Sequence, residues 1–179
     1  MMTPSPEQLI GSAFPPLVLP STIGEQVDLS NPELGAYVLF LYPRTGNPHE
    51  PDSEEWMLIP GAKGCTGEVC HFRDLMTDFT SAGFSVLGAS SQDGPAQREV
   101  AQRLSLKYPL LSDPDLRLAE ALGIDTFTFE GVRMFVRSTV VVSAGMIQAV
   151  YRGIKDPLEH PMRVLEDLVG AGGSGRAAR

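Results

Sequence analysis

The sequence predicts an α/β sandwich in which helices flank a mixed central sheet. Short apolar runs of strand length alternate with amphipathic helical patterns over most of the chain, an order typical of strands joined by helices. Near the carboxyl end, two strand patterns joined by a short glycine-containing turn precede the last helical pattern. Such an antiparallel hairpin makes the sheet mixed. With 179 residues, of which 42% are hydrophobic, the chain can bury one core.

The first predicted elements are strands. Residues 17–19 and 26–29 flank a short loop at 21–24, which is the pattern of a small N-terminal β-hairpin. Residues 37–42 form a continuous apolar run that Pro43 ends. A run of this kind indicates a central strand that is buried on both of its faces.

A long irregular stretch follows at residues 43–64 and is rich in proline, glycine, aspartate and glutamate. Long loops in compact domains often carry function. The next pattern, at residues 65–82, is helical, and Gly83 is a plausible stop. Its apolar residues recur three or four positions apart and form one face: Val69, Phe72, Met76 and Phe79.

The rest of the chain continues the alternation and ends in a helix. We expect strands at 84–89 and 109–111, helices at 95–105, 115–122 and 161–169, and a hairpin of strands at 138–142 and 146–150. Residues 170–179 are low in complexity and are expected to form a flexible tail. The sequence thus predicts a single domain at residues 1–169.

Composition argues against several classes of partner. The net charge of −8 disfavours a nucleic-acid backbone or an anionic membrane surface. Every apolar run is far shorter than the roughly 20 residues that span a bilayer. Residues 1–7 lack the basic and apolar regions of a signal peptide, so the expected location is the cytoplasm. Two cysteines in that reducing compartment suggest chemistry or metal binding more than a structural disulfide.

Cys65 and Cys70 are the candidate chemical residues. Cys65 stands where the predicted helix begins, directly after Gly64. A helix N-terminus offers unpaired N–H groups and a partial positive charge, and both favour a thiolate, which is the reactive form of cysteine. The glycine allows a substrate to approach the backbone closely.

The two sulfurs belong to different faces of the predicted helix. Cys70 lies about 140° around the axis from Cys65, and the two Cα atoms are roughly 8.6 Å apart. A disulfide needs Cα atoms closer than about 7 Å, so the first turns must unwind before the sulfurs can join. Cys65 borders the apolar face and Cys70 lies on the polar face. This arrangement suits an attacking cysteine of low pKa and a second cysteine that resolves its oxidised form.

A zinc site is the alternative that the same residues raise. The available ligands are Cys65, Cys70, His71 and His49. The chain has no second cysteine pair, and the two cysteines diverge on a helix, so we expect no metal and no cofactor. The absence of a C-x-x-C sequence also argues against a thioredoxin-like oxidoreductase.

The segment from Gly64 to Asp74, read as GCT-x-E-x-C-x-FRD, resembles the active-site segment of the peroxiredoxins. The likeness is specifically to the peroxiredoxin Q, or bacterioferritin-comigratory, subgroup. Three flanking segments match in the same order, at residues 40–43, 110–113 and 137–142. The resemblance covers roughly residues 11–169.

This resemblance implies a thioredoxin-like fold and the thiol-dependent reduction of hydroperoxides. It would make Cys65 the peroxidatic cysteine, which becomes a sulfenic acid, and Cys70 the resolving cysteine of an intramolecular disulfide. A thioredoxin or a similar dithiol would reduce that bond. Arg137 would stabilise the thiolate and orient the peroxide. Because the disulfide lies within one chain, a monomer or a weak homodimer would suffice.

The sequence departs from the family pattern just before the helix. The family's proline, seven residues before the cysteine, and its threonine or serine, three before it, are replaced by Leu58 and Ala62. If Pro43 is the family's proline, an insertion occupies about residues 46–60. Thr45 is then the candidate to supply the missing hydroxyl. The missing hydroxyl also keeps open a second class of function, a peroxide-sensing switch or binding protein with little turnover.

Four other residues near the site have expected roles. Arg44, next to the proline, would add positive potential near the sulfur, and Trp56 and Met57 in the insertion would cover the core or the pocket. Glu68 would interact with the N-terminus of its own helix.

Overall fold

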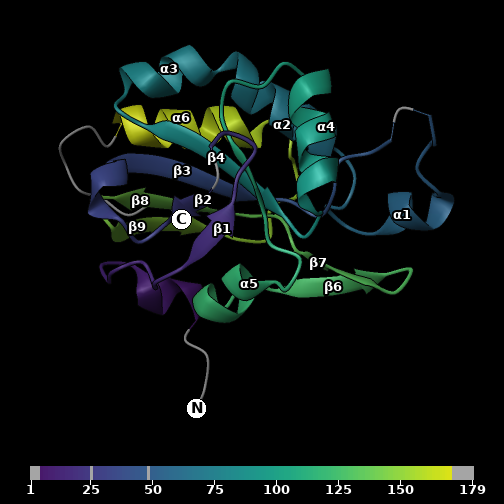
Figure 1. The fold of residues 1–179 in the computed structure, drawn as a ribbon, viewed down its shortest axis with the longest axis horizontal. Coiled ribbons are helices and arrows are strands. Elements are labelled where there is room, and N and C mark those ends of the chain that lie inside the picture. The colour runs from purple at the N-terminus through teal and green to yellow at the C-terminus, as the bar shows by residue number, and fades with distance from the viewer. Residues whose placement is uncertain (1–4, 25, 48, 171–179) are drawn as a thin grey trace.

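The computed structural model describes residues 5–24, 26–47 and 49–170 (Figure 1). Its main sheet has five strands in the order β5-β4-β3-β8-β9. The strands are β3 (Ala36–Leu41), β4 (Ser85–Ser90), β5 (Leu110–Ser112), β8 (Ser138–Ser143) and β9 (Met146–Tyr151). β3, β4 and β5 are parallel, whereas β8 is antiparallel to both β3 and β9. The predicted α/β class with a mixed central sheet is therefore confirmed.

β3 lies at the centre of this sheet and is buried on both faces, as its apolar run predicts. Val38 and Phe40 point into one core, and Tyr37, Leu39 and Leu41 point into the other. All five side chains are at most 1% exposed. Successive side chains of a strand alternate between its faces, so only a continuous apolar run can satisfy both cores.

Two layers of elements cover the two faces of the sheet (Figure 1). One core lies beneath four helices: α2 (Cys65–Asp74), α3 (Met76–Ser81), α4 (Gly94–Arg103) and α6 (His160–Gly170). The other core lies beneath η1 (Pro6–Leu9), the predicted N-terminal hairpin of β1 (Val18–Pro20) and β2 (Gln26–Asp28), and α5 (Arg117–Leu122). A short η2 (Pro32–Leu34) leads into β3.

The predicted helix at 65–82 is divided into α2 and α3. Leu75 joins them with φ −94° and ψ 4°, a conformation that interrupts the regular helix. The side chains on both sides of this joint still share one core, because the rings of Phe72 and Phe79 lie 5.7 Å apart. The periodicity of the apolar face therefore continues across the break, and the sequence pattern does not reveal it.

One helix and one hairpin were not predicted. α1 (Glu54–Leu58) forms inside the stretch expected to be irregular, and the Ser53 side chain caps it by accepting a hydrogen bond from the Trp56 N–H. β6 (Thr126–Phe129) and β7 (Val132–Phe135) form a separate hairpin.

The carboxyl end is described up to Gly170, the last residue of α6. The rest of the predicted flexible tail, residues 171–179, lies outside the described residues. Within the described part of the chain, no helix is long and apolar enough to cross a bilayer.

Candidate active site

Cys65 is the first residue of α2, and its side chain is buried. The turn into the helix is made by Gly64, whose φ of 95° is in the left-handed region that favours glycine. The Cys65 thiol donates a hydrogen bond to the carbonyl of Ala62, at 3.4 Å. The predicted placement of this cysteine at a helix start, on the apolar side, is confirmed.

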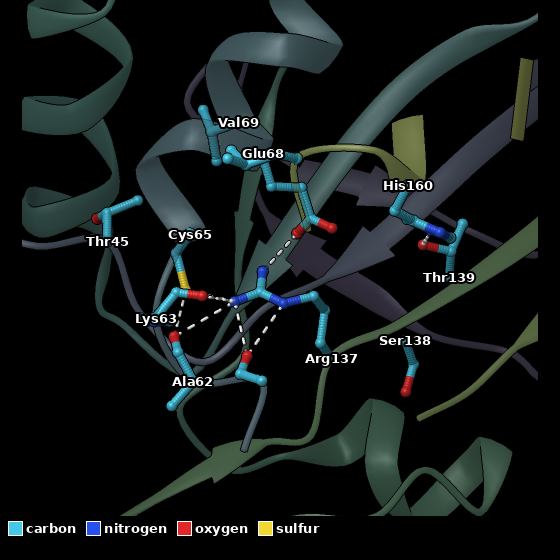
Figure 2. Close-up of polar contacts among 12 residues, drawn as sticks. Thr45, Ala62, Lys63, Cys65, Glu68, Val69, Arg137, Ser138, Thr139 and His160 are labelled. Carbon is cyan, nitrogen blue, oxygen red and sulfur yellow. Dashed lines mark hydrogen bonds and ion pairs between the residues drawn. The ribbon is translucent and has the colours of Figure 1, made fainter. Parts of the chain in front are cut away.

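Arg137 reaches the sulfur from the segment between β7 and β8. Its Nη2 donates to Cys65 Sγ at 3.2 Å, and its side chain is only 1% exposed. The same nitrogen also donates to the carbonyls of Gly61, Ala62 and Lys63. The guanidinium therefore fixes the turn that leads into α2 while it contacts the sulfur (Figure 2).

Glu68 lies on the other side of this guanidinium. Its Oε1 accepts a hydrogen bond from Arg137 Nη1 at 2.7 Å, and both side chains are buried. The expected interaction of Glu68 with the N-terminus of its own helix is replaced by this ion pair. The second carboxylate oxygen has no hydrogen-bond partner within the described residues. Figure 2 shows the Arg137 side chain lying between Cys65 and Glu68.

The electrostatics of the site follow from one cation between two acids. Burial raises the pKa of Glu68 to about 7, although Arg137 acts in the opposite direction. Burial also raises the pKa of the Cys65 thiol, while Arg137 and the backbone amide of Arg44 lower it. The expectation of a low pKa at this cysteine therefore does not hold while α2 is helical and the sulfur is buried, because desolvation outweighs the positive groups.

Cys70 lies on the same helix but is only partly buried, and both cysteines are free. The helix is continuous from Cys65 to Asp74. Residues 65 and 70 of such a helix are too far apart for a disulfide, as their spacing of roughly 8.6 Å between Cα atoms requires. Joining the two sulfurs requires α2 to unwind locally.

Thr45 is buried but is not brought to the sulfur. Its hydroxyl donates to Gln92 Oε1 at 3.3 Å, and its N–H donates to the same oxygen at 3.1 Å. Figure 2 shows this hydroxyl directed away from Cys65. The carbonyl of Ala62, rather than a threonine hydroxyl, contacts the thiol.

The insertion before α2 packs against the hairpin of β6 and β7. Trp56 is 2% exposed and contacts Phe129 with ring centroids 5.2 Å apart, so its predicted burial is confirmed, whereas Met57 is 47% exposed. The guanidinium of Arg44 lies 4.2 Å from the centre of the Trp56 ring and 5.4 Å from that of Phe129. The positive charge of Arg44 therefore lies against aromatic rings rather than beside the sulfur. Its backbone amide, not its side chain, lowers the pKa of Cys65.

His160 is a buried neighbour that the sequence did not indicate. Its Nε2 lies 2.8 Å from the hydroxyl of Thr139, and burial, with smaller effects of Arg137 and Arg163, lowers its pKa to about 4. The His160 side chain is therefore neutral at neutral pH. It lies on the opposite side of Arg137 from Cys65 (Figure 2). Within the described residues, no group of three or more His, Cys, Asp or Glu side chains is placed to hold a metal ion.

Comparisons with known proteins point to one family. Residues 57–150 match the model of the AhpC/TSA family. Peroxiredoxin Q of Arabidopsis thaliana chloroplasts is 28% identical over 161 residues, which are 90% of this chain and 67% of the relative.

Two solved structures share the fold. Peroxidoxin BcpB from Mycobacterium tuberculosis aligns with a TM-score of 0.72 at 28% identity, over 90% of this chain and 96% of the other. The bacterioferritin comigratory protein of Xanthomonas campestris, which is described as having alkyl peroxide reduction activity, aligns with a TM-score of 0.70 at 25% identity, over 87% of this chain and 92% of the other.

Proposed function

This chain belongs to the AhpC/TSA family, within its peroxiredoxin Q and bacterioferritin-comigratory group, and from that premise we propose that it reduces hydrogen peroxide and organic hydroperoxides through Cys65. The observation that carries the proposal is the buried contact of 3.2 Å between Arg137 Nη2 and the Cys65 sulfur at the start of α2. A fixed guanidinium there stabilises a thiolate and can also bind the oxygens of a peroxide. The alkyl peroxide activity of the Xanthomonas relative supports the inclusion of organic substrates.

In the first step the Cys65 thiolate attacks the terminal oxygen of the peroxide. A sulfur–oxygen bond forms and the oxygen–oxygen bond breaks, so cysteine becomes a sulfenic acid and the departing oxygen takes a proton to leave as water or an alcohol. Arg137 is placed to stabilise the negative charge before and during the attack. Burial is the main cause that raises the pKa of the Cys65 thiol, and the charge of Glu68 adds to it, so a proton on the Glu68 carboxyl favours the thiolate because one cation then serves one anion.

In the second step the Cys70 thiol attacks the sulfenic sulfur. The sulfur–sulfur bond forms and water leaves, which gives an intramolecular disulfide. An external dithiol of the thioredoxin type then donates two electrons, restores both thiols and leaves as a disulfide. The partial exposure of Cys70 supports this role, as does its position on the same helix. No second chain is needed, so we propose a monomer or weak homodimer in a reducing compartment such as the cytoplasm.

Intact mass spectrometry after one equivalent of peroxide tests the assignment of both cysteines. The wild-type chain is expected to lose two hydrogens as it forms a disulfide. Cys70→Ser is expected to gain one oxygen that a sulfenic-acid reagent traps on Cys65, and Cys65→Ser to remain unchanged. Thr77→Ala, at an exposed position of the neighbouring helix α3, is the control and should form the disulfide as wild type does.

Turnover with a thioredoxin system separates an enzyme from a sensor. Steady consumption of peroxide that requires both Cys65 and Cys70 is the expected result. A single stoichiometric oxidation without turnover would contradict the enzymatic proposal. Equal consumption by the wild type and Cys65→Ser would contradict any role of this sulfur.

A further inference from the structure

The loop between β9 and α6 crosses the part of α2 that must unwind. We propose that residues 154–158 of this loop, here called the strap, hold the first two turns of α2 in helical form and thereby set the rate of the resolving step. This inference rests on the proposed function, because the resolving step is the formation of the Cys65–Cys70 disulfide.

Three glycines mark the contact between the strap and the start of α2. A Cβ atom added to Gly64 would lie 2.6 Å from Pro157 Cγ, and one added to Gly61 would lie 3.1 Å from the carbonyl of Ile154. A Cβ atom added to Gly67 would overlap the Leu158 side chain. The strap therefore packs directly on the backbone of α2 at Gly67 and on that of the turn leading into the helix at Gly61 and Gly64.

Gly67 is the most informative of the three, since it lies inside α2. Relative to alanine, a glycine in a helix interior weakens the helix by roughly fivefold in its equilibrium constant, which is an upper value for Gly67 in the first turn. Leu158 occupies the space that a side chain at position 67 would need. The glycine thus makes the two turns easier to unwind and, at the same time, admits the strap that opposes unwinding.

A polar contact fastens the strap one turn further along the helix. His71 Nδ1 forms a hydrogen bond with the carbonyl of Leu158. A carbonyl only accepts, so Nδ1 carries the proton in this contact. His71 follows Cys70 directly, so any unwinding that carries Cys70 toward Cys65 also strains or breaks this bond.

The strap has both a fixed side and an open side. The Asp156 carboxylate accepts hydrogen bonds from the N–H groups of Leu158 and Glu159, at 3.1 Å each, and this gives the strap a defined shape. Beside it lies a cavity of about 970 Å³, lined by residues of the loop and by Met162, Arg163 and Glu166 of α6. Ile154 anchors the strap by packing against the core, whereas Lys155, Asp156 and Leu158 are exposed, so the part of the strap after Ile154 can lift from α2.

The rate of unwinding decides the fate of the sulfenic acid. A second peroxide converts it to a sulfinic acid, with release of water or an alcohol, unless Cys70 reaches it first. A strap that slows unwinding lengthens the life of the sulfenic acid and makes the protein more sensitive to high peroxide. Leu158 and His71 are thus positioning residues that act through the helix.

Leu158→Ala and His71→Ala test this inference. The Leu158 side chain is 57% exposed, so its loss leaves both cores intact. We expect either variant to form the disulfide about three to ten times faster, as the loss of one hydrogen bond or a small apolar contact implies. The peroxide concentration that gives half sulfinic acid should rise by the same factor, while the rate of sulfenic acid formation stays unchanged. Alanine is a better helix former than histidine, so propensity alone would predict the opposite result for His71→Ala.

Two controls accompany these variants. Leu158→Met keeps the apolar contact and should restore the wild-type rate. Leu34→Ala removes an exposed leucine of η2, which lies at the start of β3, and should leave every rate within about twofold of wild type. Quenched samples alkylated and weighed by mass spectrometry give the amounts of thiol, disulfide and sulfinic acid.

Gly67→Ala adds a test based on coupling. In the Leu158→Ala background the new methyl group meets no side chain, so the substitution should slow disulfide formation by up to about fivefold through helix propensity alone. In the wild-type background the methyl group also displaces the strap, so the slowing should be smaller or reversed. Equal effects of Gly67→Ala on the rate of disulfide formation in the two backgrounds would contradict the proposed role of the strap.

Hydrogen exchange of the reduced protein separates this inference from the proposed function, because it needs no peroxide. Amides 66–70 should exchange faster in Leu158→Ala and His71→Ala than in wild type. If hydrogen exchange and the rate of disulfide formation are both unchanged, the proposed role of the strap is wrong, but the proposed peroxidase function still stands. Faster exchange in a protein whose Cys65 does not react with peroxide would overturn the proposed function instead.

Discussion

Replacing Glu68 by glutamine should change how the stability of the protein depends on pH. The carboxyl is buried beside Arg137, and burial raises its pKa from 4.5 to about 7. Between these two values the folded chain keeps a proton that the unfolded chain has lost. The free energy of unfolding contributed by this group is therefore fully present below pH 4.5 and is lost as the pH rises through about 7.

The magnitude follows from the same interval. At about 1.4 kcal/mol for each pH unit, the loss between pH 4.5 and about 7 is about 3 kcal/mol. Other groups titrate in this range, among them His160, whose lowered pKa acts in the opposite direction. They titrate in both proteins, so the difference in unfolding free energy between wild type and Glu68→Gln isolates the carboxyl.

Urea unfolding at several pH values between 4.5 and 8, with the cysteines kept reduced, gives this difference. The free energy of unfolding of wild type minus that of Glu68→Gln should fall by about 3 kcal/mol as the pH rises through this range, and then level off. The exposed Thr77 provides the control, because Thr77→Ala changes no titratable side chain and its difference in unfolding free energy from wild type should stay flat. A difference that rises with pH for Glu68→Gln would refute the reasoning, since the attraction of Arg137 would then outweigh burial.

Three further predictions concern the groups around the sulfur. Arg137→Lys should slow the oxidation of Cys65 about a hundredfold, because an ammonium cannot keep every contact of the guanidinium; a loss below tenfold in single-turnover experiments would count against it. Thr45→Val should leave that rate within about twofold, since the hydroxyl bonds to Gln92, and a tenfold loss would show that the hydroxyl reaches the peroxide. Trp56→Ala should lower the free energy of unfolding by about 3 kcal/mol or more, because the ring is buried; a change below about 1 kcal/mol in urea unfolding would mean that the insertion is not part of the folded core.

The features that the sequence predicts well depend on local periodicity. The sequence predicted β3 because a strand that is buried on both faces has apolar side chains at consecutive positions, as at Val38 and its neighbours. The different surroundings of Cys65 and Cys70 follow from the 3.6-residue period of a helix, and the structure buries the first and leaves the second partly exposed. These predictions need only a few consecutive residues.

The features that it missed depend on contacts between distant segments. Glu68 and Arg137 are 69 residues apart, and a glutamate near a helix start has an ordinary local explanation in the helix dipole. The hairpin at 126–135 did carry a local signal, an alternation of threonine and phenylalanine followed by Glu130 and Gly131 in a turn. Without that hairpin, nothing in the sequence showed what Trp56 would pack against.

The ion pair and the strap bear on the same two turns of α2. Glu68 lies between Cys65 and Cys70 in the chain, so the unwinding that we propose for disulfide formation would also withdraw its carboxyl group from Arg137. When that carboxyl group carries a proton, less attraction is lost on unwinding, because a neutral group interacts more weakly with the guanidinium. Its pKa of about 7 places this change in the neutral range. In the proposed mechanism, protonation of Glu68 would therefore favour both the thiolate that attacks the peroxide and the helix opening that completes the disulfide, whereas the proposed strap would oppose only the second step.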